Sequence, residues 1–182
     1  GYFLLFESML DTVLFARDKW LASGGKVYPD RCTMSVVGVE DGNRMKEKVT
    51  FWDDVYGVKM SCMKTLVLAE PVVDIVDPNS TLTGNFVLKE INVNKVSKED
   101  LDFKSDFQLK ALRDGTLNII VGYFDIFFED GCSEKISFST HPKSPATHWK
   151  QTLFYLETPL SLQQGEIIDG VLECKKNKKD SR

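Results

Sequence analysis

The residues of this chain that could carry chemistry stand in two short segments that are far apart in the sequence. Glu7 lies in GYFLLFESMLD at the start, and His148 lies in THWKQT near the end. Carboxylate and imidazole groups move protons in many active sites. Each residue also has an ordinary explanation, because a glutamate in the first turn of a helix complements the helix dipole and a lone histidine is more often structural. The residue types alone therefore leave both interpretations open.

The composition describes a folded domain with one sizeable core. The chain has 182 residues, of which 42% are apolar and 27% charged, and its net charge is -4. The pI of about 5.3 argues against a nucleic-acid-binding surface, while a mild negative charge is compatible with a basic partner. We therefore expect no direct contact with nucleic acid.

Cysteine usage and hydropathy restrict the compartment. Cys32, Cys62, Cys132 and Cys174 are widely spaced and form no CxxC motif, which predicts free thiols in a reducing compartment and no metal site. The apolar opening at residues 2–6 lacks the basic start and the cleavage site of a signal peptide. No apolar run approaches the ~20 residues that span a bilayer. We expect a cytoplasmic protein without membrane contact, and a nuclear location is also compatible.

Periodicity predicts a helix and then a strand in the first part of the chain. Apolar side chains recur at helical spacing over residues 7–23, with Gly24 in position for a left-handed stop. Over residues 31–39 the period changes to two, which is typical of a strand. The Asp-Gly-Asn sequence at 41–43 predicts a turn.

Most of the remaining chain alternates between apolar and polar residues and is divided by turn signals, from about residue 72 to residue 174. Regularly spaced strands of this kind favour a barrel or a sandwich. Segment 44–65 interrupts the pattern with aromatic and methionine residues and predicts one or two short helices. The predicted fold class is mainly β, a β-barrel with an N-terminal helix and an inserted α-helical arm. No GxGxxG motif occurs, so no nucleotide site is predicted within the chain.

Together, these segments resemble the C-terminal half of a type I protein arginine N-methyltransferase. The resemblance rests on the order and separation of GYFLLFESMLD, FWDDVYGVKMSCMK and THWKQT, and it extends through VVDIVDP, GYFDIFF and KKNKKD. The segments FWDDVYG, MSCMK, GYFDI and NKKD favour the family member numbered 3 over the member numbered 1.

The resemblance implies catalytic roles for the two opening candidates. In the family, the segment that matches residues 1–10 closes a loop whose two glutamates grip the substrate guanidinium. Glu7 matches the second glutamate, and the first is expected upstream of Gly1. The histidine of the family's THW loop lies beside the substrate, and His148 matches it. Tyr2 is expected against the reacting guanidinium.

Further residues fall inside the matching segments. Met9 is expected near the methyl donor and the substrate nitrogen, and Thr12, one helical turn beyond it, near the cofactor. Trp149 is expected to line the substrate site. Each has an ordinary alternative, since Met9 and Thr12 could pack the seam between helix and barrel and Trp149 could belong to the core. His141 is expected to be an exposed loop histidine without a role.

The resemblance also implies a dimerisation arm at about residues 44–65. In the family, a helical arm docks on the cofactor domain of the other subunit and gives a head-to-tail homodimer. Trp52, Tyr56, Met60 and Met63 are expected to form its apolar face. The alternative is a helix that packs on its own barrel.

These expectations define two units, residues 1–25 as the loop end with its linking helix and residues 26–182 as the barrel with its arm. S-adenosyl-L-methionine is the expected methyl donor, bound mainly by a Rossmann-like domain outside the chain, so residues 1–182 alone are expected to be inactive. Arginine/glycine-rich proteins are the expected substrates, and ω-N-monomethylarginine and asymmetric dimethylarginine the products. The competing hypothesis is a non-catalytic β-barrel module for protein interaction.

Overall fold

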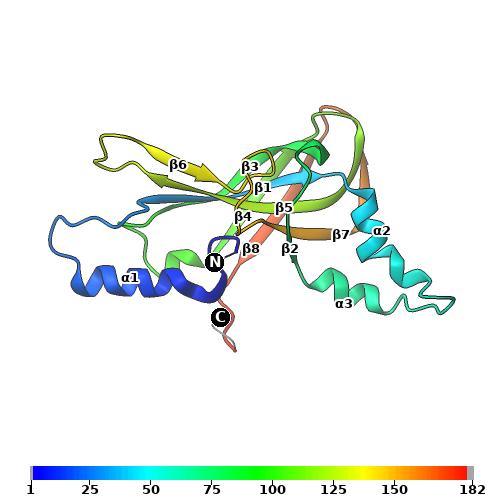
Figure 1. The fold of residues 1–182 in the computed structure, drawn as a ribbon, viewed down its shortest axis with the longest axis horizontal. Helices are drawn as coiled ribbons and strands as arrows, with labels where there is room; N and C mark the ends of the chain where they lie inside the picture. Colours follow the sequence, from blue (N-terminus) through cyan, green and yellow to red (C-terminus); the bar gives the residue numbers. More distant parts are fainter. Residues whose placement is uncertain (1, 180–182) are drawn as a thin grey trace.

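The structure, a computed structural model, describes residues 2–179. It is mainly β, with helix α1 near one end of the molecule and a helical arm at the other (Figure 1). The helical elements are η1 (Phe6–Ser8), α1 (Met9–Trp20), α2 (Gly42–Lys48), η2 (Thr50–Asp53), α3 (Met63–Ala69), η3 (Pro78–Ser80) and η4 (Glu99–Leu101). The strands are β1 (Arg31–Val39), β2 (Val72–Asp74), β3 (Thr81–Asn92), β4 (Phe103–Lys110), β5 (Gly115–Phe128), β6 (Ile136–Ser139), β7 (Gln151–Leu162) and β8 (Ile167–Cys174).

The strands form two antiparallel sheets that share a core. The larger sheet has the order β2-β7-β5-β1-β3, with β6 paired to β5, and the smaller sheet pairs β4 with β8. A bridge between Thr83 and Ala111 joins β3 to the end of β4. The predicted fold class is confirmed: a mainly β, barrel-like domain with an N-terminal helix and an inserted arm. Within residues 2–179, the strands do not pair into one closed ring.

Strand β1 begins and ends where the sequence predicts. It lies inside the larger sheet between β3 and β5, and every residue from 32 to 39 is buried. One face carries Val37 and Val39 into a cluster beneath the arm. The opposite face carries Cys32 and Met34 into a cluster beneath helix α1. Both faces of the sheet are therefore core.

Helix α1 is shorter than the predicted 7–23. Glu7 and Ser8 have left-handed φ values of 67° and 53°, so regular helix begins at Met9. The helix ends at Trp20, where the following residue is extended. Leu14 is the buried residue of α1, whereas most of the predicted apolar face is exposed. The apolar repeat correctly predicted that this segment is helical. It did not predict where the helix begins and ends, because the backbone changes direction there without a local sequence signal.

The segment 41–43, which predicts a turn, is instead the start of α2. The Asp41 carboxylate accepts a hydrogen bond from the Arg44 N–H at 2.9 Å and so satisfies a free donor of the first helical turn. The turn prediction was wrong because aspartate is favoured both in turns and at helix N-caps.

The arm covers residues 42–69, somewhat more than the predicted 44–65, and its base is fixed to the sheet. Met45 of α2 and Val49, which follows the helix, are buried in the cluster that contains Val37 and Val39. The base of the arm is therefore part of the core.

Met45→Ala is expected to lower the free energy of unfolding of this domain by about 2–5 kcal/mol, because the truncation leaves a cavity beneath the arm. Its exposed neighbour on the same helix is the control, and Lys46→Ala should change that free energy by about 0.5 kcal/mol or less. Urea unfolding followed by circular dichroism measures both values. Equal effects of the two substitutions would contradict the anchoring of the arm through Met45.

Candidate functional site

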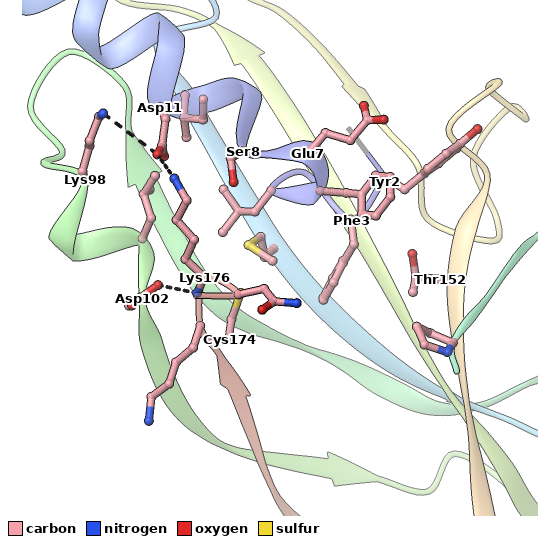
Figure 2. Close-up of a pocket in the computed structure, with 18 of the residues that line it drawn as sticks. Tyr2, Phe3, Glu7, Ser8, Asp11, Lys98, Asp102, Thr152, Cys174 and Lys176 are labelled. Atoms are coloured by element: carbon pink, nitrogen blue, oxygen red, sulfur yellow. Dashed lines mark hydrogen bonds and ion pairs between the residues drawn. The ribbon is translucent and has the colours of Figure 1, made fainter. Parts of the chain in front are cut away.

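Segments from distant parts of the sequence line a cavity of about 780 Å³ (Figure 2). They include the N-terminal segment before α1, strands β2 and β7 of the larger sheet, and the chain after β8 together with the loop around η4. The lining includes Tyr2, Phe3, Glu7, Ser8, Asp11, Val73, Lys98, Asp102, Thr152, Phe154, Cys174 and Lys176.

The N-terminal segment has an unusual backbone. Phe3, Leu4, Glu7 and Ser8 all have φ between 42° and 67°, the left-handed region that residues with a Cβ rarely adopt. Such conformations cost on the order of 1–3 kcal/mol each, persist where surrounding contacts enforce them, and cluster at functional sites. The backbone therefore singles out this segment independently of any sequence motif.

The structure brings Tyr2 and Glu7 together at the cavity. Both side chains belong to the lining, and both reach solvent. Figure 2 shows the Glu7 carboxylate and the Tyr2 ring on one side of the N-terminal segment, directed away from Asp11 and Lys176. Glu7 was expected at the head of α1, and it lies instead in the η1 turn that precedes the helix. Its carboxylate is open to a ligand that approaches from solvent.

His148 lies in a tight turn outside the cavity lining. Strand β7 begins only at Gln151, and the N–H of Lys150 donates a hydrogen bond to the carbonyl of Thr147 at 3.1 Å. The His148 ring is exposed and lies 4.1 Å from the ring of the next residue, measured between centroids. The turn leads directly into β7, whose Thr152 lines the cavity. His148 itself is not part of the lining, and its catalytic role stays a prediction.

Trp149 packs into an aromatic cluster. Its ring stacks on Phe138 with centroids 5.6 Å apart and meets Phe124 edge-on at 6.0 Å. It is half-buried and lies outside the cavity lining. These contacts favour the core interpretation, and a substrate contact of Trp149 stays a prediction.

Met9 and Thr12 share the exposed side of α1. Met9 is 59% exposed, Thr12 is also exposed, and neither lines the cavity. Packing against the barrel, the ordinary alternative, is not their environment here. Their predicted place beside a cofactor is not tested by the described residues.

His141 is not the exposed loop histidine that the sequence predicts. It is half-buried, its ring lies edge-on to Tyr123 with centroids 4.8 Å apart, and its Nδ1 accepts a hydrogen bond from the Lys143 N–H at 3.0 Å. Burial and the nearby Lys143 ammonium lower the pKa of His141, while Asp125 opposes them. The contact of this loop with Tyr123 of β5 joins residues that are distant in the sequence, so no local pattern predicted it.

Sequence patterns carried no signal for the charged residues that close the cavity. The Asp11 carboxylate bonds to the ammonium of Lys176 and lies 4.0 Å from that of Lys98. Asp102 accepts a hydrogen bond from the backbone N–H of Lys176 at 2.8 Å. Asp11 and Lys176 are 165 residues apart, so no spacing rule could pair them. These contacts tie helix α1 to the chain that follows β8.

The four predicted arm residues occupy different environments. Tyr56 is 97% exposed, whereas Trp52, Met60 and Met63 are partly buried. Val55 and Val58 bridge across a two-residue turn at the tip, and the N–H of Met60 bonds to the Trp52 carbonyl at 3.1 Å. The arm therefore has its own internal structure and presents Tyr56 at its end.

The cysteines are free thiols, as predicted. Burial raises the pKa of Cys32 to about 11, and burial with a smaller contribution from Asp102 raises the pKa of Cys174. A raised pKa keeps a thiol protonated and unreactive at neutral pH.

Within residues 2–179, no group of three or more His, Cys, Asp or Glu side chains is placed to hold a metal ion. The helices of that range are all too short or too polar to cross a bilayer.

Comparison with known families identifies the group to which this site belongs. The family model described as "Arginine methyltransferase oligomerization subdomain" matches residues 30–182. The chain belongs to the protein arginine methyltransferase family. It is 44% identical to protein arginine N-methyltransferase 1 of Dictyostelium discoideum and 46% identical to that of Chlamydomonas reinhardtii, over 182 residues in each case. The alignments cover 100% of this chain but 53% and 52% of those proteins, so the chain spans about half their length.

Solved structures of the family have the same fold. A chain of the Trypanosoma brucei PRMT1 enzyme-prozyme heterotetrameric complex with AdoHcy matches with a TM-score of 0.95 at 37% identity, over 100% of this chain and 57% of that one. Arabidopsis thaliana protein arginine methyltransferase 10 matches in fold, with a TM-score of 0.81 at 23% identity, over 100% of this chain and 60% of that one. The relatives named above include members numbered 1, and the expected closeness to the member numbered 3 is not supported.

The lowered pKa of His141 gives stability a pH dependence. An unfolded chain has a histidine pKa of about 6.5, so between the folded and unfolded values the unfolded state binds more protons. The contribution of neutral His141 is therefore complete above about pH 6.5 and is lost as pH falls below it toward the folded pKa. NMR titration of the imidazole should give a midpoint below about 6.5, and His141→Gln should flatten this part of the stability profile. A midpoint at or above the unfolded value would contradict the assigned environment.

Proposed function

We propose that this chain is the substrate-binding and oligomerisation part of an S-adenosyl-L-methionine-dependent protein arginine methyltransferase. The proposed products are ω-N-monomethylarginine and asymmetric dimethylarginine, and the proposed substrates are arginine/glycine-rich proteins. One observation carries the proposal: a chain of this family places the Glu7 carboxylate and the Tyr2 ring at the open side of one cavity. The four free thiols support a reducing compartment, such as the cytoplasm or nucleus.

Glu7 has the chemistry that such a substrate needs. A guanidinium is planar and always charged, and its paired N–H donors match the two oxygens of a carboxylate. The Glu7 carboxylate, which reaches solvent, can accept two such hydrogen bonds and draw positive charge toward itself. The opposite nitrogen is then better able to attack a methyl carbon, provided that it approaches in line with the bond that breaks. The role proposed for Glu7 is therefore to bind and to orient.

The remaining predicted residues complete the proposed site. Tyr2 would pack against the guanidinium from the same segment as Glu7, and His148 would border the substrate from the turn before β7. Met9 would restrict the space around the nitrogen that receives the second methyl group, which supports the proposed product. Trp149 would act mainly by holding the His148 turn, since its ring is fixed in the aromatic cluster.

The described residues could contact the methyl donor from one side, but they do not form a binding site for it. The donor would supply an electrophilic methyl group. Met9 and Thr12 offer exposed side chains on α1 that could contact it, but the sequence has no glycine-rich loop to hold its adenosine. The proposed binding domain for the donor therefore lies in the part of the relatives that this chain does not span.

The arm is the proposed contact with a second subunit in a head-to-tail homodimer. The family model is named for oligomerisation, and the tip presents Phe51, Tyr56 and Val58 to solvent. The alternative of a module that binds proteins without catalysis would use the same arm. It would not require the strained segment that carries Glu7, and the Glu7→Gln experiment below separates the alternatives.

Glu7→Gln in the whole enzyme is expected to lower turnover by about 100-fold, because the neutral amide no longer stabilises the charge that moves through the guanidinium. The melting temperature should stay close to that of the unaltered protein, since the Glu7 side chain is not buried. Steady-state kinetics with an arginine-rich peptide, beside thermal melts, measures both. Glu134→Gln, the same change at an exposed glutamate outside the cavity, is the matched control. Unchanged turnover in Glu7→Gln would refute the catalytic role.

Residues 1–182 on their own are expected neither to methylate arginine nor to bind S-adenosyl-L-methionine measurably, because they lack a loop that could hold the adenosine. Isothermal titration calorimetry tests the binding, with the whole protein as positive control. Micromolar affinity of the isolated chain for the donor would contradict the proposal that a domain outside residues 1–182 binds the donor.

Tyr56→Ala in the whole protein is expected to weaken self-association by about tenfold or more, because exposed aromatic anchors carry much of the binding energy of an interface. The side chain is 97% exposed, so the substitution should leave the fold intact. Analytical ultracentrifugation gives the association constant, and Glu47→Ala, exposed on α2 at the base of the arm, serves as control. If both variants associate as the unaltered protein does, the tip is not the contact.

A further inference from the structure

The middle of strand β5 has a notch on the face toward the cavity. Gly122 is buried there and pairs with Val36 of β1 on one side and with Thr152 of β7 on the other. Directly paired residues of antiparallel strands have their side chains on the same face, and Thr152 lines the cavity. Because glycine has no side chain, a gap is left at Gly122 between the side chains of Val36 and Thr152.

The ring of Phe3 occupies this notch. A Cβ atom placed on Gly122 would lie 2.7 Å from Cε2 and 2.9 Å from Cζ of Phe3, which is closer than real Cβ contacts come. Phe3 also meets Phe154 of β7 edge-on, with ring centroids 6.0 Å apart. Figure 2 shows the Phe3 side chain pointing from the N-terminal segment into the cavity. Phe3 thus packs the N-terminal segment directly onto β5 and β7, beside Leu4 and Leu5, which pack against the same core.

Backbone conformation is not the reason for the glycine. The φ of Gly122 lies outside the left-handed region, in contrast to that of Gly24 at 77°, so residues with a side chain can adopt it. Gly84 on β3 provides a comparison, because a Cβ there would have its nearest neighbour, the carbonyl oxygen of Lys110, at 4.0 Å. What distinguishes position 122 is the space that Phe3 needs.

The seat of Phe3 fixes the residues that follow it. The Phe3 carbonyl accepts a hydrogen bond from the Leu5 N–H at 2.7 Å, around Leu4 with φ 63°. The Leu5 carbonyl in turn accepts one from the N–H of Ser8 at 3.2 Å. These bonds bracket Glu7 within a short, closed stretch of backbone. Hydrogen bonds therefore link the backbone of Phe3 to the stretch that carries Glu7.

We infer that Phe3 is a positioning residue for Glu7, and that Gly122 is the seat in the sheet that allows it. The inference deepens the proposed function and rests on it for the role of Glu7 in turnover. The contact between Phe3 and Gly122 is a separate, directly measurable part. Catalysis by positioning is sensitive to small displacements, since a shift of about 1 Å at a reacting group can cost about 100-fold in rate.

The test is a double-mutant cycle in the whole enzyme with Gly122→Ala, Phe3→Leu and their combination. The added methyl group should push the Phe3 ring out of the notch and lower kcat about tenfold, with little change in KM for a peptide. The shorter leucine side chain leaves room for that methyl group, so Phe3→Leu should remove most of the effect of Gly122→Ala. Gly84→Ala, where a methyl group has space, is the matched control and should keep the unaltered kcat.

Hydrogen exchange supplies a readout that does not need activity. Gly122→Ala should speed exchange at the amides of Leu5 and Ser8 while the amides of the β1–β5 ladder stay protected. If Gly122→Ala does not fold, Phe3→Ala tests the same contact from outside the sheet and should speed the same amides.

Two results would overturn the inference. One is unchanged exchange together with unchanged kcat in these variants, and the other is an equal effect of Gly122→Ala with and without Phe3→Leu. A failure of the proposed function looks different. The exchange at Leu5 and Ser8 would then respond as expected, while the whole protein would methylate no arginine, and the contact between Phe3 and Gly122 would stand.

Discussion

The pairing of β1 with β5, buried on both faces, is the constraint on which the rest of the structure depends. This ladder runs without a register shift from the Arg31–Phe127 pair to the Val39–Ile119 pair, whereas the ladder of β1 with β3 is interrupted twice. One face of the two strands holds the base of the arm, and the other holds helix α1 and the N-terminal segment. Because a packed interior transmits small displacements, the arm and the site share one rigid support.

A buried glutamine joins three connections at the edge of this support. The side chain of Gln151 accepts a hydrogen bond from the Val76 N–H at 2.9 Å and donates one to the Thr140 carbonyl at 2.8 Å. The Thr140 hydroxyl in turn bonds to the backbone of Phe124. A buried hydrogen-bond network favours one arrangement of the segments that it joins. It therefore fixes the return from the arm, the His141 loop and the start of β7 relative to one another.

The site combines a strained segment with a rigid one. Residues 2–8 contain four left-handed residues and are held by a few short-range hydrogen bonds, while the wall they face is the continuous sheet. Strain of this kind persists because Phe3 is seated at Gly122 and because Asp11 is tied to Lys176 at the far side of the cavity. Glu7 is thus placed by the tertiary contacts of its neighbours, and its carboxylate remains available to a ligand.

Sequence by itself determined the features that depend on local periodicity and on short motifs. The bounds of β1, the helical character of α1 and the interruption of the strand pattern at 44–65 follow from patterns within a few residues. The role of Glu7 was expected only from the resemblance to the family. Tertiary structure alone decided where α1 begins, that Asp41 caps a helix, that His141 is half-buried on Tyr123, and that Phe3 lies in the notch at Gly122. Each of these depends on a contact or a backbone reversal for which neighbouring residues carry no signal, because the partner lies elsewhere in the chain or the local preference is shared between two conformations.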